Sequence, residues 1–256
     1  MRAIVTGAAR GIGRAICLRL ARDAQASGGV KLVLSDQHAD ELKSLIAEVR
    51  SLGGQAIAVP GDMSDAALPA IIVQAAEAFG GLDALVSNAG FAIPGPLASY
   101  DVNNWDKVFA VHVRAPWLLA KAAYPALKAS RGAIVVTASI SGTNAQAPLG
   151  PYSASKAAVL MLVKQLANEW GPDGIRVNAF SPGLTVTPGT AAAYSTPDAR
   201  AQREARIPLR RVAEADDMAG AQQIYNVFDP LVKPHLATLA LVGGVVTITG
   251  SNFAAS

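Results

Sequence analysis

A serine, a tyrosine and a lysine are spaced in this chain so that they could move a proton to or from a substrate oxygen. Tyr152 and Lys156 are four residues apart in a stretch with helical periodicity, so both side chains would lie on one face of a helix. A tyrosine phenol titrates at about 10, and a neighbouring ammonium stabilises its phenolate. Ser139 follows a predicted strand and would hold the oxygen that Tyr152 protonates or deprotonates. Alone, a Tyr-x-x-x-Lys pair is usually a solvated helix face, so its meaning depends on the other motifs.

A glycine-rich turn directly follows the first predicted strand and precedes a helix; its sequence is Thr6-Gly7-Ala8-Ala9-Arg10-Gly11-Ile12-Gly13. Glycines let the backbone approach a pyrophosphate closely. The N-terminus of a helix offers free N–H groups and the positive end of the helix dipole. In this context the turn predicts a dinucleotide site rather than an ordinary tight turn.

The second predicted strand ends at Asp36, about 23 residues beyond Gly13, where a carboxylate can accept hydrogen bonds from an adenosine ribose. That carboxylate would repel a 2′-phosphate by roughly 1–4 kcal/mol. Two observations leave alternatives open. Arg10 in the turn could bind a 2′-phosphate, and Asp36 could instead cap the helix that follows it. The pattern favours NAD over NADP as the cofactor.

These residues must be positioned by an alternation of short β-branched runs and longer helical stretches, which is typical of βαβ units around a parallel sheet. The predicted strands are Ala3–Thr6, Lys31–Ser35, Ala56–Val59, Ala84–Ser87, Ala133–Thr137, Arg176–Phe180 and Ala237–Val242. The predicted helices run from the glycine turn to about Ala24, over His38–Leu52, Ala66–Phe79, about Val102–Ala129 and Tyr152–Trp170, and from Asp216 to about Val227. The sequence predicts one doubly wound α/β Rossmann domain over residues 1–256, with a seven-stranded, mainly parallel sheet and helices on both faces. Residues 184 to about 207 lack clear periodicity and are expected to form a mobile flap.

Composition and charge exclude several classes of protein. With 51% hydrophobic and 16% charged residues, the chain is not intrinsically disordered, and it favours a large core with surface covered by partner subunits. The net charge of +3 is spread without a basic block, so no nucleic-acid partner is predicted. No apolar run is long enough to span a membrane, and a strand follows Met1 and Arg2 with no room for a signal peptide. The single cysteine, Cys17, is expected at an inert core position. A cytoplasmic location is therefore expected.

Taken together, the motifs resemble those of the short-chain dehydrogenase/reductase family, in order and spacing, from residue 2 to about residue 220. The matching pieces are TGAARGIG (6–13), Asp36, Asp62 in GDMSD, Asn88-Ala89-Gly90, Ser139, Tyr152-Ser153-Ala154-Ser155-Lys156, Ile175-Arg176-Val177-Asn178, Pro182-Gly183 and Thr187. The resemblance implies hydride transfer between a nicotinamide cofactor and a carbinol carbon whose oxygen is held by Ser139 and Tyr152.

The resemblance also implies individual cofactor contacts. Asp62 would bind the adenine amino group, Asn88 would support the cofactor wall, and Lys156 would hold the nicotinamide ribose. Thr187 and the Pro182-Gly183 turn would hold the carboxamide. From the residues alone, Asp62 could also be a helix N-cap and Asn88 a turn residue. The full expected cofactor site consists of Gly7, Arg10, Gly11, Ile12, Gly13, Asp36, Asp62, Met63, Asn88, Ala89, Gly90, Tyr152, Lys156, Pro182, Gly183, Thr185 and Thr187.

One departure from the family lies in the long helix before Ser139. Many family members carry an asparagine 27 residues before the catalytic serine, as part of a proton relay through water and the lysine; here that position is His112. In the family its role rests largely on a local break in the helix that frees a main-chain carbonyl, which a histidine could still permit. Two interpretations stay open: His112 borders the relay, or it is only a packed helix residue. A His112→Ala enzyme with unchanged turnover across pH 6–9 would exclude the first.

The second departure concerns residues 221–256. The family commonly ends with an ITG turn and a strand leading to Asp-Gly-Gly, whereas this chain has Pro234-His235-Leu236 and Val242-Gly243-Gly244 at those positions. The preceding helix contains Gln222-Gln223-Ile224-Tyr225-Asn226, which is less apolar than usual. His235 is expected to be a loop residue, and no His/Cys/Asp spacing predicts a metal site. This segment makes a tetramer a weaker expectation than a dimer.

The expected substrate pocket is mainly apolar, with a few hydroxyl and amide groups. Phe91–Pro94, Ser141–Gln146, Leu184 and Tyr194 would line it. No arginine is obviously aimed into it, so a strongly anionic substrate is not favoured. The substrate-binding residues expected are Ser139, Ser141, Gln146, Tyr152, Leu184 and Tyr194. A secondary alcohol or ketone of modest polarity fits: a cyclic alcohol, a diol, a polyol or an aryl carbinol.

Partners and rival functions follow from the same motifs. The alanine-rich helices over 102–129 and 152–170 are expected to pair across the axis of a homodimer, commonly within a homotetramer, as the resemblance implies. The leading hypothesis is an NAD-dependent alcohol dehydrogenase or carbonyl reductase. An NADP-dependent 3-oxoacyl thioester reductase is the alternative enzyme, against which Asp36 argues. A non-catalytic nucleotide-binding regulator is the alternative from another class, against which the intact Ser139, Tyr152 and Lys156 argue.

Overall fold

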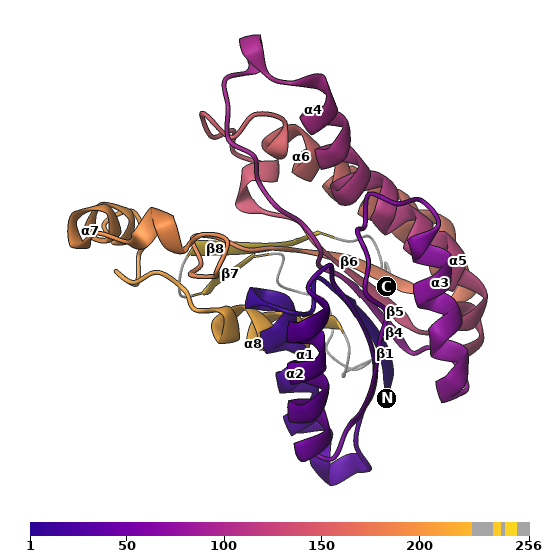
Figure 1. Ribbon diagram of the computed structural model, residues 1–256. Helices are drawn as coiled ribbons and strands as arrows, with labels where there is room; N and C mark the ends of the chain where they lie inside the picture. The colour runs from indigo at the N-terminus through magenta and orange to yellow at the C-terminus, as the bar shows by residue number, and fades with distance from the viewer. Residues whose placement is uncertain (227–237, 242–243, 250–256) are drawn as a thin grey trace.

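In the described part of the chain, six parallel strands form most of the sheet, in the order β3-β2-β1-β4-β5-β6, and β8 and β7 extend it beyond β6 in antiparallel pairing. The structure is a computed structural model that describes residues 1–226, 238–241 and 244–249 (Figure 1). The strands are β1 (Arg2–Thr6), β2 (Lys31–Ser35), β3 (Gln55–Ala58), β4 (Ala84–Ser87), β5 (Ala133–Thr137), β6 (Arg176–Ser181), β7 (Thr238–Leu241) and β8 (Gly244–Thr249).

Helices cover both faces of the sheet, as the hydrophobic patterns predict. They are α1 (Gly11–Asp23), α2 (Ala39–Ser51), α3 (Leu68–Ala75), α4 (Val102–Phe109), α5 (Ala115–Ser130), α6 (Tyr152–Trp170), α7 (Pro197–Glu204) and α8 (Ala215–Asn226). Figure 1 shows α1, α2 and α8 on one face, and α3, α5 and α6 on the other, with α4 extending that layer. The predicted doubly wound α/β architecture with a parallel sheet is confirmed.

Two apolar clusters hold these layers together, one on each face. On one face, Leu119 of α5 and Val159 and Val163 of α6 pack against the central strands, all of them fully buried. On the other face, Ile16 and Cys17 of α1 pack in one cluster with strands β1 and β2 and with α8. Strands covered on both faces need continuous apolar runs rather than alternation, which explains why β1, β2, β4 and β5 are almost entirely buried. Cys17 lies in the core, as predicted, and burial raises the pKa of its thiol.

The predicted number of strands is wrong. The six parallel strands fall close to their predicted ranges, but the seventh, Ala237–Val242, contains β7, which pairs antiparallel with β8. β8 lies between β7 and β6 and comes from the β-branched run Gly244–Thr249, which the glycine at its start obscured as a strand. Ala237 and Val242 lie outside the described residues, as do Val227, Pro234-His235-Leu236 and Gly243.

The long helix predicted over 102–129 is interrupted. α4 ends at Phe109, residues Ala110–Arg114 form a π-helical turn, and α5 continues from Ala115. A π-helical turn inserts one residue into the α-helical hydrogen-bond ladder and is frequent at functional sites. The local break expected around His112 is therefore present. Among the described residues, no helix is long and apolar enough to cross a membrane.

The predicted flap has its own secondary structure. A 3₁₀ turn over Ala191–Tyr194 and the short helix α7 lie between β6 and α8. Figure 1 shows α7 projecting from the rest of the described chain. Whether this segment moves stays a prediction.

Candidate active site

The parallel arrangement brings the predicted site residues to one edge of the sheet. Because β1, β2, β4, β5 and β6 are parallel, the segments that follow them all leave at the carboxyl ends of the strands. The chain order reverses between β1 and β4, and ligands of open α/β sheets bind at such a reversal. The glycine turn, Asp36, Asn88 and Ser139 directly follow four of these strands.

Ser139, Tyr152 and Lys156 come together between β5 and the start of α6. Ser139 is buried, and its hydroxyl lies near enough to the Tyr152 phenol to lower the pKa of that phenol. Lys156 is 4% exposed, and its Nζ lies 5.7 Å from the centre of the Tyr152 ring. That ammonium donates to the main-chain oxygen of Thr137 at 2.7 Å, which fixes it at the end of β5. One face of the first turns of α6 thus presents both groups to Ser139.

Burial controls the protonation of this group. Burial raises the pKa of the Tyr152 phenol, and the Ser139 hydroxyl offsets only part of the effect. Burial also lowers the pKa of Lys156 to about 8, so that the ammonium remains mainly charged at neutral pH. The lowered phenol pKa expected from the sequence is not found in the chain alone. The reason is that desolvation by burial has the largest effect on the phenol, and the Lys156 ammonium donates to Thr137 instead.

The backbone of the glycine turn lies so close to neighbouring backbone atoms that side chains would not fit at two of its positions. Gly7 has φ +62°, and a Cβ on it would lie 2.8 Å from the Ala89 Cα. A Cβ on Gly13 would lie 2.0 Å from the Gly7 oxygen, so no other residue fits there. α1 begins at Gly11, within this glycine-rich stretch, without a side-chain cap or an acidic residue in its first turn. Its N-terminal N–H groups are therefore suited to an anion.

Asn88 fastens this turn to two neighbouring strands. Its amide donates to the oxygens of Thr6 and Gly7 at 3.2 and 3.3 Å, and its own Oδ1 accepts from the Thr137 hydroxyl at 3.0 Å. The Thr6 hydroxyl in turn accepts from the Asn88 and Ala89 N–H groups. Asn88 is thus more than a turn residue, because it sets the spacing between β1, β4 and β5 where the cofactor wall is predicted. No pattern in the sequence indicated that Thr6 and Thr137 take part in these hydrogen bonds.

Asp36 is oriented by the backbone around it. Its carboxylate accepts from the Ala9 N–H at 3.0 Å and from the His38 N–H at 3.1 Å, and the His38 ring lies 2.8 Å from it. α2 begins later, at Ala39, with His38 at its N-cap position and no side-chain cap. Asp36 is therefore not the cap of that helix. It stands beside the glycine turn, where a ribose hydroxyl is predicted to bind.

Arg10 is paired with an acidic residue that the sequence reasoning did not single out. Glu41, in the first turn of α2, accepts from the Arg10 guanidinium, with the Arg10 Nε at 3.1 Å. Both side chains are more than one-third exposed. Arg10 also lowers the pKa of the Glu41 carboxyl. Glu41 lies two residues into a predicted helix, so only the tertiary packing of α2 on α1 reveals the pair.

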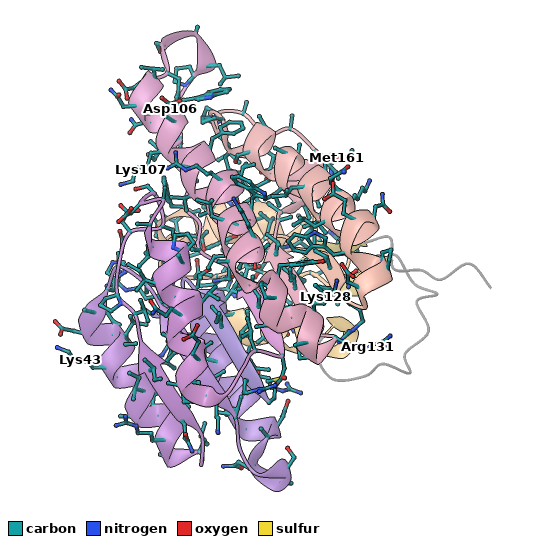
Figure 2. All side chains as sticks on the ribbon, turned by 90° about the vertical axis from the view of Figure 1, so that its right-hand side faces the viewer. Lys43, Asp106, Lys107, Lys128, Arg131 and Met161 are labelled. Atoms are coloured by element: carbon teal, nitrogen blue, oxygen red, sulfur yellow. The ribbon has the colours of Figure 1, made fainter. Side chains whose placement is uncertain are left out.

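Asp62 and Met63 follow β3. Asp62 accepts from the Ser64 N–H at 2.9 Å and pairs with Lys107 of α4 at 3.2 Å, and these contacts lower the pKa of its carboxyl. Figure 2 shows Lys107 on α4. Because α3 begins only at Leu68, with no side-chain cap, Asp62 is not a helix N-cap. Met63 is buried in the core cluster under α3 and α5.

The segment after β6 returns to the glycine turn. A Cβ on Gly11 would lie 3.2 Å from the Thr187 Cβ, so these two predicted cofactor residues are in contact. The Thr190 hydroxyl accepts from the Thr187 N–H and donates to the Thr185 oxygen, which shapes this loop. The Thr185 hydroxyl donates to the Gly183 oxygen at 3.1 Å. The segment that follows β1 and the segment that follows β6 thus meet at Gly11 and Thr187.

The predicted substrate residues are less uniform. Ser141 is buried and its N–H donates to the Ser139 hydroxyl at 3.1 Å, so it orients that serine. Leu184 is half-buried and Gln146 is exposed. Tyr194 lies under the guanidinium of Arg203 of α7, 5.6 Å from the ring centre, and burial raises the pKa of its phenol. An arginine therefore does stand beside one predicted pocket residue, which the sequence pattern did not reveal.

The fold and the arrangement of Ser139, Tyr152 and Lys156 beside a dinucleotide-type turn define an oxidoreductase of the Rossmann type. A family model for the short chain dehydrogenases matches residues 1–198. The chain belongs to the short-chain dehydrogenase/reductase family, as the motifs indicated.

Known relatives are similar over most of the chain. A 2,5-dichloro-2,5-cyclohexadiene-1,4-diol dehydrogenase of Sphingobium indicum is 36% identical, and the match covers 85% of each chain. A cis-4-hydroxycyclohexanecarboxylate dehydrogenase of Sinomonas cyclohexanicum is 38% identical over 86% of each chain. The crystal structure of a short chain dehydrogenase from Burkholderia cenocepacia, in complex with NADP, is 35% identical with a TM-score of 0.78, covering 87% of this chain and 89% of the other.

Proposed function

We propose that this protein is an NAD(H)-dependent dehydrogenase of secondary alcohols, with Tyr152 as its general acid and base. The observation that carries the proposal is the position of the Tyr152 phenol. It lies beside the Ser139 hydroxyl, which lowers its pKa, and near the Lys156 ammonium, at the edge of the sheet where the glycine turn lies. A phenol kept protonated by burial can give its proton to a carbonyl oxygen, and the phenolate that this leaves can take a proton from an alcohol.

The residues of the chain fit a nicotinamide dinucleotide. The uncapped N-terminus of α1 and the glycines at positions 7 and 13 suit a pyrophosphate, and Asp36 suits a ribose diol. When bound, the cofactor supplies the centre that accepts or donates hydride. Asn88 holds the wall beside it, and Thr187 closes on Gly11 from the other side.

The protein groups would share the proton chemistry. In the reducing direction the Tyr152 hydroxyl donates its proton to the substrate oxygen, while the Ser139 hydroxyl donates a hydrogen bond to the same atom. The charge of Lys156 then favours the phenolate that remains. In the oxidising direction the phenolate accepts the alcohol proton. The location of these groups in a buried setting strengthens each electrostatic contact.

Two features support NAD rather than NADP. The Asp36 carboxylate would face a 2′-phosphate with like charge. The Arg10 guanidinium, which could attract such a phosphate, is paired with Glu41. The Burkholderia cenocepacia relative is in complex with NADP, so the preference must be measured for this chain rather than carried over.

We propose a hydroxylated six-membered ring as the substrate class. The names of two relatives describe dehydrogenases of a cyclohexadienediol and of a hydroxycyclohexanecarboxylate. A cyclic alcohol or diol was among the substrates expected from the apolar residues around the predicted pocket. Arg203 beside Tyr194 makes a carboxylate-bearing ring worth including in the test, although an anionic substrate was not favoured by the sequence.

We also propose a homo-oligomer that pairs through α4–α5 and α6. Large apolar side chains are exposed on these helices, among them Trp117 of α5 and Met161 of α6, with 43% and 62% of their surfaces accessible. Figure 2 shows Met161 standing on the surface of α6. Exposed apolar surface of this kind is typical of a subunit interface. Sedimentation analysis of the purified protein distinguishes a dimer from a tetramer.

A substrate screen tests the proposal. Purified protein would be incubated with cyclohexanols, cyclohexanediols, hydroxycyclohexanecarboxylates, open-chain alcohols and 3-oxoacyl thioesters, with NAD(H) and NADP(H) side by side. We expect turnover of ring alcohols with NAD. Turnover confined to thioesters with NADPH would favour the alternative reductase. Cofactor binding without turnover of any substrate would favour a nucleotide-binding regulator.

A further inference from the structure

The imidazole of His112 is held at both of its nitrogens. Its Nε2 accepts from the N–H of Phe91 at 3.2 Å, and its Nδ1 lies 2.8 Å from the Ser155 hydroxyl. The Ser155 hydroxyl lies 2.7 Å from the main-chain oxygen of Tyr152, to which it donates. His112 is 2% exposed and Ser155 is fully buried. A continuous chain of hydrogen bonds therefore links the loop after β4 to the catalytic tyrosine.

This chain of bonds assigns the protonation of the ring. Nε2 accepts from a backbone N–H and so carries no proton, which places the single ring proton on Nδ1. Nδ1–H then donates to Ser155, and Ser155 donates onward, so each donor has an acceptor. Burial and the nearby Lys156 ammonium lower the pKa of His112 to about 2, in agreement with a neutral ring. The remaining ionisable group against the ring is the Tyr152 phenol.

The ring also determines where its neighbours stand. It meets the Tyr152 ring edge-on, with centres 5.4 Å apart, and it packs against the Phe91 ring at 5.7 Å. A Cβ on Gly90 would lie 3.2 Å from His112 Nε2 and 3.5 Å from Lys156 Nζ. His112 is brought to this place by the π-helical turn Ala110–Arg114. Three segments thus converge on one neutral ring.

We propose that His112 and Ser155 form a fixed bridge that positions Tyr152 and the Gly90–Phe91 backbone for the reaction. The bridge does not carry the reaction's proton, because both ring nitrogens are committed to structural hydrogen bonds. His112 and Ser155 are positioning residues, since they act through the Tyr152 backbone and the loop after β4. This inference rests on the proposed function, in which Tyr152 is the general acid and base.

Two amide substitutions distinguish the two hydrogen bonds of the His112 ring, the one with the Phe91 N–H and the one with the Ser155 hydroxyl. In His112→Asn the side-chain amide reaches the place of Nδ1 and can still donate to Ser155, but it is too short to reach Phe91. In His112→Gln the amide oxygen reaches the place of Nε2 and can accept from Phe91, but the bond to Ser155 is lost. Ser155→Ala removes the hydrogen bond between His112 and Ser155 but keeps the one between His112 and Phe91. It deletes only one oxygen, so we expect the variant to fold. Ser153→Ala is the matched control, because the buried Ser153 hydroxyl has no hydrogen-bond partner among the described residues.

The experiment measures kcat, the dissociation constant of NAD and the pH profile of kcat for these variants, with wild-type enzyme and Tyr152→Phe beside them. We expect kcat to fall about tenfold in Ser155→Ala and in His112→Gln. The double variant His112→Gln/Ser155→Ala should show no further fall, because both substitutions remove the same hydrogen bond between His112 and Ser155. We expect less loss in His112→Asn, none in Ser153→Ala, NAD dissociation constants within about twofold of wild type, and pH profiles of unchanged shape.

Three results would overturn the bridge: unchanged kcat in Ser155→Ala, additive losses in the double variant, or recovery of His112→Gln by added imidazole, which would reveal proton transfer by the ring. A failure of the proposed function looks different. In that case Tyr152→Phe keeps its turnover, or the wild-type enzyme has none. Loss of turnover in Tyr152→Phe together with full turnover in Ser155→Ala would reject the bridge alone.

Discussion

The catalytic part of the site and the part predicted to face adenosine are built in different ways. Ser139, Lys156 and His112 are each less than 10% exposed, and their polar atoms are joined by hydrogen bonds to the protein. Around Asp36, by contrast, the charges are paired at the surface, as in Arg10 with Glu41, where both side chains are more than one-third exposed. The catalytic part is thus held by buried hydrogen bonds, and the part predicted to face adenosine is surrounded by charges that solvent screens.

The difference predicts how each part responds to change. A buried polar group that loses its partner cannot turn to water, so a single substitution has a large effect. An exposed ion pair contributes only about 0–1 kcal/mol, so substitutions there adjust affinity in small steps. We therefore expect single substitutions in the buried catalytic group to lower turnover strongly. Substitutions among the exposed charges near Asp36 should change the preference between NAD and NADP with little effect on turnover.

The largest effect in this comparison, apart from loss of the Tyr152 hydroxyl, is expected from Ser139→Ala. The substitution removes a hydrogen-bond donor to the substrate oxygen, and loss of such a donor typically lowers kcat by about 10²–10³-fold. The NAD dissociation constant, measured by fluorescence titration, should stay close to that of wild type. A decrease in kcat smaller than fivefold would place the reacting oxygen elsewhere.

The next largest effect is the contribution of Lys156 to the pH dependence of the free energy of unfolding. Burial lowers the folded-state pKa of Lys156 to about 8, below the ordinary lysine value of 10.5. Between these values the unfolded chain binds more protons than the folded one, so this lysine makes stability rise with pH through that window, by roughly 3 kcal/mol in total. Below about pH 8 both states are protonated and the contribution is constant.

Urea unfolding of wild type and Lys156→Met between pH 7.5 and 9.5 measures this contribution. The free energy of unfolding of wild type should rise relative to that of the variant as the pH increases. A difference that stays flat, or that changes in the opposite direction, would show that the ammonium is not desolvated as its burial indicates.

In the part predicted to face adenosine, Asp36→Asn should change cofactor preference. Removing the carboxylate charge removes the repulsion of a 2′-phosphate, which is worth roughly 1–4 kcal/mol at about 4 Å. The ratio of kcat/KM with NADP to that with NAD should rise about tenfold or more, with kcat on NAD little changed. An unaltered ratio would contradict the placement of the ribose at Asp36.

The smallest effect is expected from Glu41→Gln. It keeps the shape of the side chain and releases the Arg10 guanidinium toward a 2′-phosphate, so the same ratio should rise about two- to fivefold and less at high salt. Lys43→Gln, which breaks the neighbouring exposed pair with Asp40, is the matched control. If the rise in this ratio did not depend on salt, or were equally large in Lys43→Gln, Arg10 would not be binding the 2′-phosphate directly.

Much of this organisation could be predicted from the sequence, because it depends on local patterns. The parallel strands and the convergence of Ser139, Tyr152 and Lys156 follow from β-branched runs, helical spacing and the parallel-sheet rule. The partners that emerged only in the structure include Ser155, Glu41 and Arg203. Their contacts depend on how helices pack and on the extra residue of a π-helical turn, which hydrophobic periodicity does not reveal. The strand β8 was missed because a glycine pair next to a β-branched run resembled a loop.

The central claim is that Tyr152 transfers the proton in an NAD(H)-dependent oxidation of a ring alcohol. Its most direct test is Tyr152→Phe, which deletes one oxygen and keeps the ring that packs against His112. Turnover of the best alcohol from the screen and the dissociation constant of NAD should be measured on the same preparation. We predict a loss of turnover of at least about a thousandfold with the NAD dissociation constant within about twofold of wild type. Turnover within tenfold of wild type would contradict the assignment.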